Sequence, residues 1–301
     1  MSDLFAWGPL ALGTFEFGST LNTAATHALL DAFAERGGQL LDTAPTYGGA
    51  HAETLIGDWA RRSGAPVRIV TKAGLDPARL DRAVLDADHL AASAERSAHR
   101  LGRPADVLVL HRDDPAVPVA EVAHTLHHIT RTGTAVRVGA SNWSTPRLRA
   151  WIAYARAHDL TIPVCTQPLW SLARRTRPVR EPWLVEADDD HLHLAIEQNL
   201  AVLPYRVLAA GFLATHHSGR HDAHTHATYR TDANTARLHR LREVAADLCT
   251  TSTVAAISYL RAATAAAVIP IMGARTPAQV REAWQVANVH LSAAALAYLA
   301  G

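Results

Sequence analysis

The chain has 301 residues, of which 49% are hydrophobic and 19% charged, and its formal net charge is +1. This composition supplies a large core and excludes a wholly disordered chain, and the balanced charge argues against a general nucleic-acid binder. No segment reaches the roughly 20 apolar residues that a membrane helix needs, and the N-terminus lacks a secretory signal pattern, so we expect a cytoplasmic protein that contacts no membrane.

Short apolar runs alternate with helical patterns along the whole chain. The runs expected as strands are 10–14, 40–42, 67–72, 106–111, 135–140, 161–167, 200–205 and 267–271. The segments expected as helices are 22–36, 50–62, 88–101, 118–131, 145–158, 189–199, 235–248, 253–263, 277–287 and 292–299, with an irregular stretch over 206–234. Eight strands alternating with helices are typical of a closed parallel (β/α)8 barrel, and no break in composition divides the chain. The sequence therefore predicts an α/β protein with one barrel domain over residues 1–301.

Ionisable residues stand at the ends of three successive predicted strands. Asp42 ends the second strand, with Tyr47 on the loop that follows; Lys72, the only lysine of the chain, ends the third; His111 ends the fourth. Taken singly, each has an ordinary explanation as a turn cap, a loop aromatic, a surface cation or a core histidine. In a (β/α)8 barrel, however, the C-terminal strand ends meet at the rim where the chemistry is done. We therefore expect these four side chains to lie together.

Six segments, in order along nearly the whole chain, resemble the aldo-keto reductase family, and the NADPH-dependent bacterial type in particular. They are LDTAPTYG at 41–48, VTK at 70–72, LHR at 110–112, GASNW at 139–143, TQ at 166–167 and PIMGAR at 270–275. The resemblance implies a barrel that reduces an aldehyde or ketone with a nicotinamide cofactor.

The resemblance assigns Asp42, Tyr47, Lys72 and His111 to the family's catalytic tetrad. Tyr47 would donate the proton to the carbonyl oxygen, and because a free phenol has a pKa of ~10, the Lys72 ammonium would be needed to lower that pKa. Asp42 would pair with Lys72 and fix its position. His111 would donate a hydrogen bond that orients the substrate oxygen.

A glycine and an arginine before a helix start predict the phosphate end of the cofactor site. Gly273 permits close backbone approach, Thr276 and Pro277 open a helix whose free N–H groups suit a phosphate, and Arg275 offers a forked donor. The alternative is a capped surface helix with a solvated Arg275. In the family this position reads the 2′-phosphate, which favours NADPH over NADH. The resemblance adds further cofactor contacts at Thr14, Ser141, Asn142, Gln167, Tyr205, Gln279 and Glu282.

The sequence departs from the family at several positions. Arg206 stands where a serine usually contacts pyrophosphate, in the segment Arg206–Leu208 that is Ser-Pro-Leu in the family, and Arg206 either pairs with the phosphates or points into solvent. Leu208 keeps the family residue, and we expect both to lie at the cofactor. Ala283 replaces an asparagine that commonly contacts adenine. These changes put cofactor affinity in question more than the chemistry.

Aromatic residues on strand-end loops predict the substrate pocket, although some of them will be packing residues. The pocket is assigned to Phe15, Trp143 and Trp170, with Phe17 and Trp183 on similar loops. The histidines at 216, 217, 221, 224 and 226 crowd one irregular stretch, which we interpret as a loop over the nucleotide; a metal site is the less favoured alternative.

The favoured function is an NADPH-dependent carbonyl reductase, acting as a monomer or small homo-oligomer on a sugar or a secondary-metabolite carbonyl. Richness in Arg, Ala and His hints at a high-GC bacterial source, which fits secondary metabolism. A catalytically weak nucleotide-binding barrel that serves as a sensor or interaction subunit is the alternative. A barrel lyase or isomerase without nicotinamide is a third possibility, which the Arg275 helix start disfavours.

Overall fold

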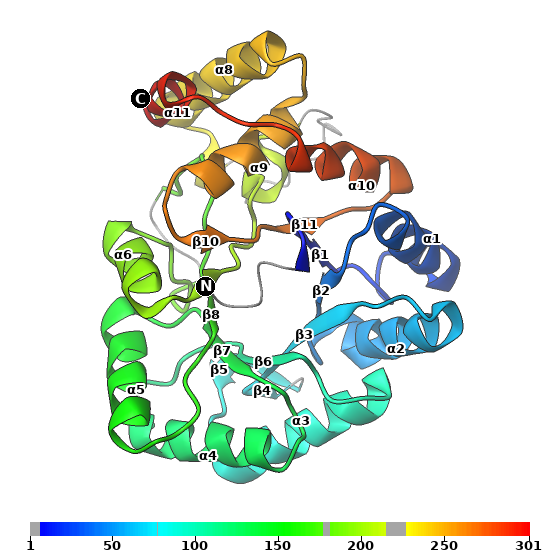
Figure 1. Cartoon of the computed structure of the whole chain (residues 1–301), viewed down its shortest axis with the longest axis vertical. Helices are drawn as coiled ribbons and strands as arrows, with labels where there is room; N and C mark the ends of the chain where they lie inside the picture. Colours follow the sequence, from blue (N-terminus) through cyan, green and yellow to red (C-terminus); the bar gives the residue numbers. More distant parts are fainter. Residues whose placement is uncertain (1–6, 77, 177–180, 215–226) are drawn as a thin grey trace.

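The strands form one curled sheet that closes on itself inside a ring of helices (Figure 1). The computed structural model describes residues 7–76, 78–176, 181–214 and 227–301. Every neighbouring pair of barrel strands is parallel. In sheet order the strands are β10 (Ala267–Val268), β9 (Ala201–Val202), β8 (Cys165–Gln167), β7 (Val138–Ser141), β6 (Val107–Leu110), β3 (Arg68–Ala73), β2 (Leu40–Asp42), β1 (Ala11–Gly13) and β11 (Ile271–Gly273).

The last barrel strand is split in two, and this split closes the ring. The sequence predicts one strand over 267–271, but the structure separates β10 from β11 at Pro270, which has no N–H to donate to a neighbour. β10 pairs with β9, whereas β11 pairs with β1. Counted with its two halves together, this is the eighth strand, and the predicted (β/α)8 barrel is confirmed.

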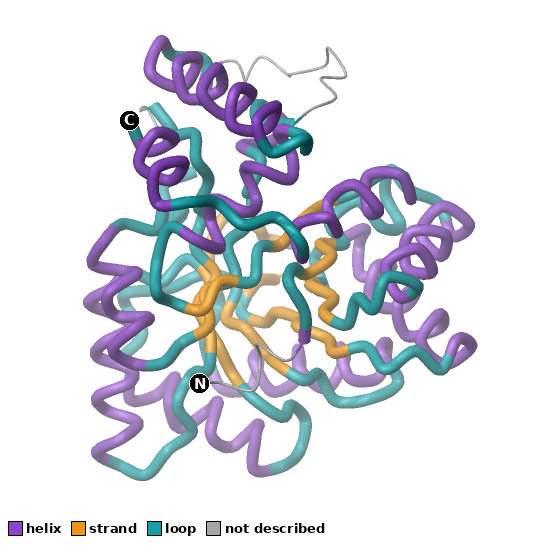
Figure 2. The backbone as a smooth tube through the Cα atoms, turned by 45° about the horizontal axis from the view of Figure 1, so that its top comes forward, coloured by secondary structure: helices purple, strands orange, loops and turns teal. Residues whose placement is uncertain are grey.

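Figure 2 shows the helices as a layer outside the strands. The barrel helices are α1 (Thr23–Ala34), α2 (His51–Ser63), α3 (Ala87–Leu101), α4 (Val119–Arg131), α5 (Thr145–Ala157), α6 (Asp189–Gln198), α9 (Ser252–Ala262) and α10 (Pro277–Trp284). Two further helices, α8 (Asp232–Asp247) and α11 (Ala293–Ala300), pack on each other and on α9 outside the ring (Figure 1). No helix among the described residues is long and apolar enough to cross a membrane.

A short antiparallel hairpin, β4 (Leu75–Asp76) with β5 (Arg79–Ala83), follows β3. The sequence predicts no element here, because the run over 79–83 carries two arginines and an aspartate rather than an apolar pattern; in the structure four of the five β5 residues are exposed. Since the hairpin lies between the C-terminal end of β3 and α3, it stands on the rim where the predicted site residues meet.

Strand alternation decides which side chains enter the barrel. Leu40, Val70 and Val109 belong to a hydrophobic cluster inside the barrel, called here the interior cluster. Their neighbours Leu41 and Ile69 belong to the layer between strands and helices. Successive strand side chains point to opposite faces, so the residues two positions after these interior ones also face the barrel axis. Those residues are Asp42, Lys72 and His111.

The opposite end of the barrel is covered by Trp7. This side chain is buried against the interior cluster. The guanidinium groups of Arg68, at the beginning of β3, and Arg137, just before β7, lie 5.9 and 5.6 Å from the centroid of its ring. The interior is therefore apolar and covered at one end, and its polar groups gather at the other.

Two left-handed glycines shape the loop that carries Tyr47. The 3-10 turn Tyr47–Ala50 contains Gly48 at φ 55° and Gly49 at φ 62°. A Cβ atom at Gly48 would lie 2.3 Å from the backbone oxygen of Phe17, whereas a Cβ at Gly49 would meet nothing within 4 Å. The close approach at Gly48 joins this loop to the loop after β1.

These two glycines provide a matched pair of alanine variants. Gly49→Ala should lower the free energy of unfolding by about 1–2 kcal/mol, the usual penalty of a left-handed backbone for a residue with a Cβ. Gly48→Ala should lower it further, because the added methyl group also displaces the Phe17 backbone. Urea unfolding of both variants measures the difference, and equal losses would show that the contact between the loops carries no strain.

Candidate active site

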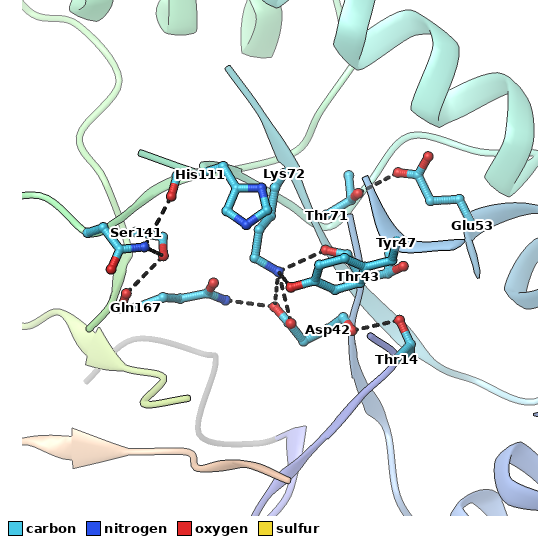
Figure 3. Close-up of polar contacts among 11 residues, drawn as sticks. Thr14, Asp42, Thr43, Tyr47, Glu53, Thr71, Lys72, His111, Ser141 and Gln167 are labelled. Atoms are coloured by element: carbon cyan, nitrogen blue, oxygen red, sulfur yellow. Dashed lines mark hydrogen bonds and ion pairs between the residues drawn. The ribbon is translucent and has the colours of Figure 1, made fainter. Parts of the chain in front are cut away.

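Lys72 is the centre of a buried polar cluster at the C-terminal rim of the barrel (Figure 3). Its Nζ donates to both carboxylate oxygens of Asp42 at 2.8 and 2.9 Å, to the backbone oxygen of Thr43 at 2.9 Å, and to the Tyr47 hydroxyl at 3.2 Å. Lys72 and Asp42 are each only 3% exposed. The ammonium is thus held between a carboxylate and a phenol.

Asp42 is fixed by groups from two further strands. The Gln167 Nε2 group at the end of β8 donates to Asp42 Oδ1 at 2.9 Å. The Thr14 hydroxyl and backbone N–H, just after β1, both donate to the Asp42 backbone oxygen, at 2.9 and 3.0 Å. The carboxylate therefore has little freedom to turn away from Lys72.

His111 and Phe15 flank the Tyr47 ring. The ring centroids of Tyr47 and His111 are 6.1 Å apart, and those of Tyr47 and Phe15 are 5.2 Å apart, both edge to face. His111 Nδ1 is buried and has no hydrogen-bond partner. The four residues expected together at the rim, Asp42, Tyr47, Lys72 and His111, therefore form one cluster.

The pKa of Tyr47 is higher than that of a free phenol. Burial raises it most, the Lys72 charge opposes burial, and the Asp42 charge raises it further. The sequence predicts that Lys72 brings the Tyr47 pKa below the ordinary value. In the structure Lys72 acts in the expected direction but does not outweigh burial. Tyr47 is consequently a protonated phenol at neutral pH.

At neutral pH Lys72 is charged and His111 is neutral. Burial lowers the pKa of Lys72, but the adjacent Asp42 and Tyr47 more than compensate, so the net shift is upward and the ammonium stays charged. Burial lowers the pKa of His111 well below its usual range, and the charges of Lys72 and Arg112 add to the effect. His111 is therefore a neutral imidazole beside a fixed cation.

Ser141, Asn142, Gln167 and Tyr205 form a continuous hydrogen-bonded group beside this cluster. Ser141 Oγ donates to the Gln167 backbone oxygen at 2.9 Å, and Asn142 Nδ2 donates to Ser141 Oγ at 3.0 Å. The Tyr205 hydroxyl donates to Asn142 Oδ1 at 2.6 Å. The Gln167 side-chain oxygen is buried without a partner. This unsatisfied acceptor fits an amide N–H₂ group such as that of a nicotinamide carboxamide.

The residues expected at the phosphate end lie around the beginning of α10. A Cβ at Gly273 would meet no atom within 4 Å, so packing does not require glycine there and the backbone is open to a ligand. Gln279 accepts a hydrogen bond from the Arg275 N–H at 2.7 Å. Glu282 Oε1 is buried without a partner. The Arg275 guanidinium is bound by the Glu16 carboxylate, a contact that the sequence does not predict.

Arg206 neither points into solvent nor stands free. Its two terminal nitrogens donate to the Glu181 carboxylate at 2.9 and 3.1 Å. This pair crosses the rim from the loop after β9 to the loop after β8. Leu208, two residues on, packs against two hydrophobic clusters: the layer between strands and helices, and a second cluster that includes Leu213 and the α8 residue Leu241.

The aromatic residues expected in the substrate pocket differ in exposure. Phe15 is 70% exposed beside Tyr47, and Trp170 is half-buried. Trp143 is wrong as a pocket residue: it has no exposed surface and packs against Trp151 of α5. Phe17 is likewise buried. Trp143 and Phe17 both pack in the apolar layer between strands and helices.

Sequence reasoning missed Arg112 as a rim residue, although it directly follows His111. Its guanidinium lies 3.7 Å from the centroid of the Trp183 ring and donates to the Leu80 backbone oxygen in the β4–β5 hairpin. It thereby joins two loops at the mouth of the site. A signal was present in the sequence, since a cation next to a strand-end histidine has to lie on the same rim.

The histidines at 216–226 lie outside the described residues. Within the described part, no group of three or more His, Cys, Asp or Glu side chains could hold a metal ion. A separate pocket, lined by Gly8, Pro9, Arg261, Ala266, Ala267, Val268 and Ala287, opens at the end of the barrel where β10 begins. It lies away from the polar cluster and offers one charged group.

Comparison with known proteins agrees with these features. The sequence model of the Aldo/keto reductase family matches residues 9–301. The chain is 30% identical to the human aflatoxin B1 aldehyde reductase member 2 over 168 residues, 54% of this chain and 46% of the relative. It is 28% identical to the norsolorinic acid reductase stcV of Emericella nidulans over 225 residues, 67% and 54% of the two chains. It is also 28% identical to the aldo-keto reductase ausK of Aspergillus calidoustus over 221 residues, 67% and 53%. The chain spans about half the length of these relatives.

The buried pair of Asp42 and Lys72 makes a stability prediction. Lys72→Met leaves the Asp42 carboxylate buried without its counter-charge and should lower the free energy of unfolding by about 3–5 kcal/mol. The double variant Asp42→Asn, Lys72→Met removes both charges and should recover part of the loss. Urea unfolding measures both, and a single variant as stable as the double one would contradict the ion-pair assignment.

Proposed function

The chain belongs to the aldo/keto reductase family, and we propose on this premise that it is an NADPH-dependent reductase that converts an aldehyde or ketone to an alcohol. The observation that supports the proposal most strongly is Lys72 Nζ held between the Asp42 carboxylate and the Tyr47 hydroxyl. The unsatisfied Gln167 oxygen supports a carboxamide neighbour. The family generally uses nicotinamide cofactors, so a reduced nicotinamide would supply the hydride.

Tyr47 is the proton donor in this proposal. As hydride reaches the carbonyl carbon, negative charge grows on the oxygen, and the Tyr47 O–H bond breaks as the alcohol O–H bond forms. The raised Tyr47 pKa keeps this proton available at neutral pH. The Lys72 ammonium then stabilises the phenolate that is left, because it lies at hydrogen-bond distance from the phenol oxygen.

His111 and Asp42 have supporting parts. The neutral His111 donates an N–H to the carbonyl oxygen; a cationic imidazole would instead compete with Tyr47 as the acid. Asp42 keeps Lys72 protonated and aimed at Tyr47. Both act on the same oxygen, either directly or through their neighbours.

The cofactor would extend along the rim from Gln167 to Arg275. Gln167 Oε1 would accept from the carboxamide, Ser141 and Asn142 would hold it from the same hydrogen-bonded group, and Tyr205 would lie against the ring. Gly273 and the N–H groups at the beginning of α10 receive the phosphate end. Arg275 reads the 2′-phosphate as a forked donor.

A bulky secondary-metabolite carbonyl is the proposed substrate class. Two of the relatives are named for reducing aflatoxin B1 aldehyde and norsolorinic acid. The exposed Phe15 ring beside Tyr47 and the partly buried Trp170, whose backbone N–H donates to the Tyr205 backbone oxygen, offer apolar surface for such a molecule.

Tyr47→Phe should lower kcat for carbonyl reduction by at least roughly 100-fold, because the proton donor is lost, while NADPH binding stays nearly unchanged. In the unaltered protein, the rate should not fall between neutral pH and about 10, the ordinary pKa of a phenol, because the pKa of Tyr47 is raised above that value. Steady-state rates across pH test both statements. Tyr298→Phe, on the exposed face of α11, is the control. A Tyr47→Phe variant that keeps most of its turnover would favour a barrel that only binds nucleotide.

Arg275→Ala should weaken NADPH binding much more than NADH binding, since only NADPH carries the 2′-phosphate. Titration of tryptophan fluorescence with each nucleotide measures the two dissociation constants. Arg281→Ala removes an exposed charge from α10, the helix that begins two residues after Arg275, and should leave the NADPH-to-NADH ratio unchanged. Equal weakening of both nucleotides by Arg275→Ala would remove the 2′-phosphate assignment.

A further inference from the structure

The guanidinium of Arg275 is already occupied by a carboxylate. Arg275 Nε donates to the two Glu16 oxygens at 2.9 and 2.7 Å, and a terminal nitrogen donates to Glu16 Oε1 at 2.6 Å. The two residues are 259 positions apart and meet because β1 and β11 are neighbours in the closed sheet. This forked contact uses the donors that a phosphate group would need.

The Glu16 side chain is held in place by its own loop. The Glu16 backbone oxygen accepts hydrogen bonds from the Ser19 and Leu21 N–H groups, which closes a tight turn. The Thr20 hydroxyl donates to Glu16 Oε2 at 2.8 Å. The next residue, Phe17, is buried in the core and anchors the turn. The carboxylate is therefore presented to Arg275 by an ordered backbone.

Glu16 is ionised at neutral pH. Partial burial alone would raise its pKa, but the hydrogen bonds from Arg275 and Thr20 and the Arg275 charge hold the pKa below its ordinary value. Of the pair, the side chain of Glu16 is 25% exposed and that of Arg275 is 66% exposed. The carboxylate is thus the more buried partner of the pair and the guanidinium the more exposed one.

We propose that Glu16 is a specificity-determining residue that competes with the cofactor 2′-phosphate for Arg275. To reach Arg275, NADPH has to displace the Glu16 carboxylate or place its phosphate dianion beside that carboxylate. Either event lowers the affinity for NADPH. NADH carries a hydroxyl at that position, which leaves the ion pair intact and can donate to a carboxylate, as ribose hydroxyls do in other dinucleotide sites. This inference rests on the proposed function of Arg275. Its consequence is that the chain prefers NADPH over NADH less strongly than it would if Arg275 had no carboxylate partner.

The test uses Glu16→Gln, with Glu35→Gln as the charge-matched control. Glu35 is exposed at the end of α1, which packs beside α10. Because exposed ion pairs contribute up to ~1 kcal/mol, Glu16→Gln should tighten NADPH binding roughly 2- to 5-fold. The affinity for NADH should stay the same or fall. The probes are NADPH, NADH and 2′,5′-ADP, which carries the 2′-phosphate without the nicotinamide.

Glu16→Asp separates contact from charge. Aspartate keeps the charge but is one methylene shorter, so it should release Arg275 and tighten NADPH binding as Glu16→Gln does. If the Asp variant binds like the unaltered protein, direct competition for Arg275 is wrong. If Glu16→Gln shifts NADPH and NADH equally, or no more than Glu35→Gln, the inference also fails.

These outcomes are distinct from a failure of the proposed function. Should Arg275→Ala discriminate against NADPH while Glu16→Gln changes nothing, Arg275 keeps its role and only the competition is overturned. Should Arg275→Ala weaken both nucleotides equally, the 2′-phosphate assignment itself falls, and the competition falls with it.

Discussion

The buried ion pair between Asp42 and Lys72 is the constraint on which the rest of the site depends. Two charges removed from water are tolerated only where their remaining hydrogen bonds are met, and here Gln167, Thr43 and Tyr47 meet them. Satisfying the pair therefore ties together the ends of β2, β3 and β8 and the loop that carries the phenol. The groups that make the pair tolerable are also those that the proposed reaction needs.

The charge pattern around the pair follows from burial as much as from neighbours. The same desolvation that raises the Tyr47 pKa lowers that of His111, so both are neutral, whereas Lys72 keeps its charge because Asp42 contacts it. In the proposed reaction, the Lys72 cation and the two neutral donors would stabilise an oxygen that gains negative charge. A second cation at His111 would supply a competing acid on the same rim.

Much of this arrangement was predictable from the sequence, and the exceptions share a cause. Strand ends that finish in Asp42, Lys72 and His111 are local patterns, and barrel closure follows from alternating elements. The hairpin Leu75–Ala83 was missed because its residues are exposed and charged, so apolar periodicity gives no signal. The burial of Trp143 and the contact of Glu16 with Arg275 depend on which distant segments pack together. The net rise of the Tyr47 pKa was missed for a similar reason, since the degree of burial is a property of the assembled rim.

The short turn after β1 touches both halves of the rim. Phe15 lies against the Tyr47 ring and Glu16 holds Arg275, while the Phe17 backbone leaves no room for a side chain at Gly48. An insertion or deletion in this turn would shift the aromatic wall and the carboxylate together. Variation among natural homologues at this turn is thus expected to exchange side chains at constant length, and substrate range and choice of electron donor would drift as linked traits rather than independently.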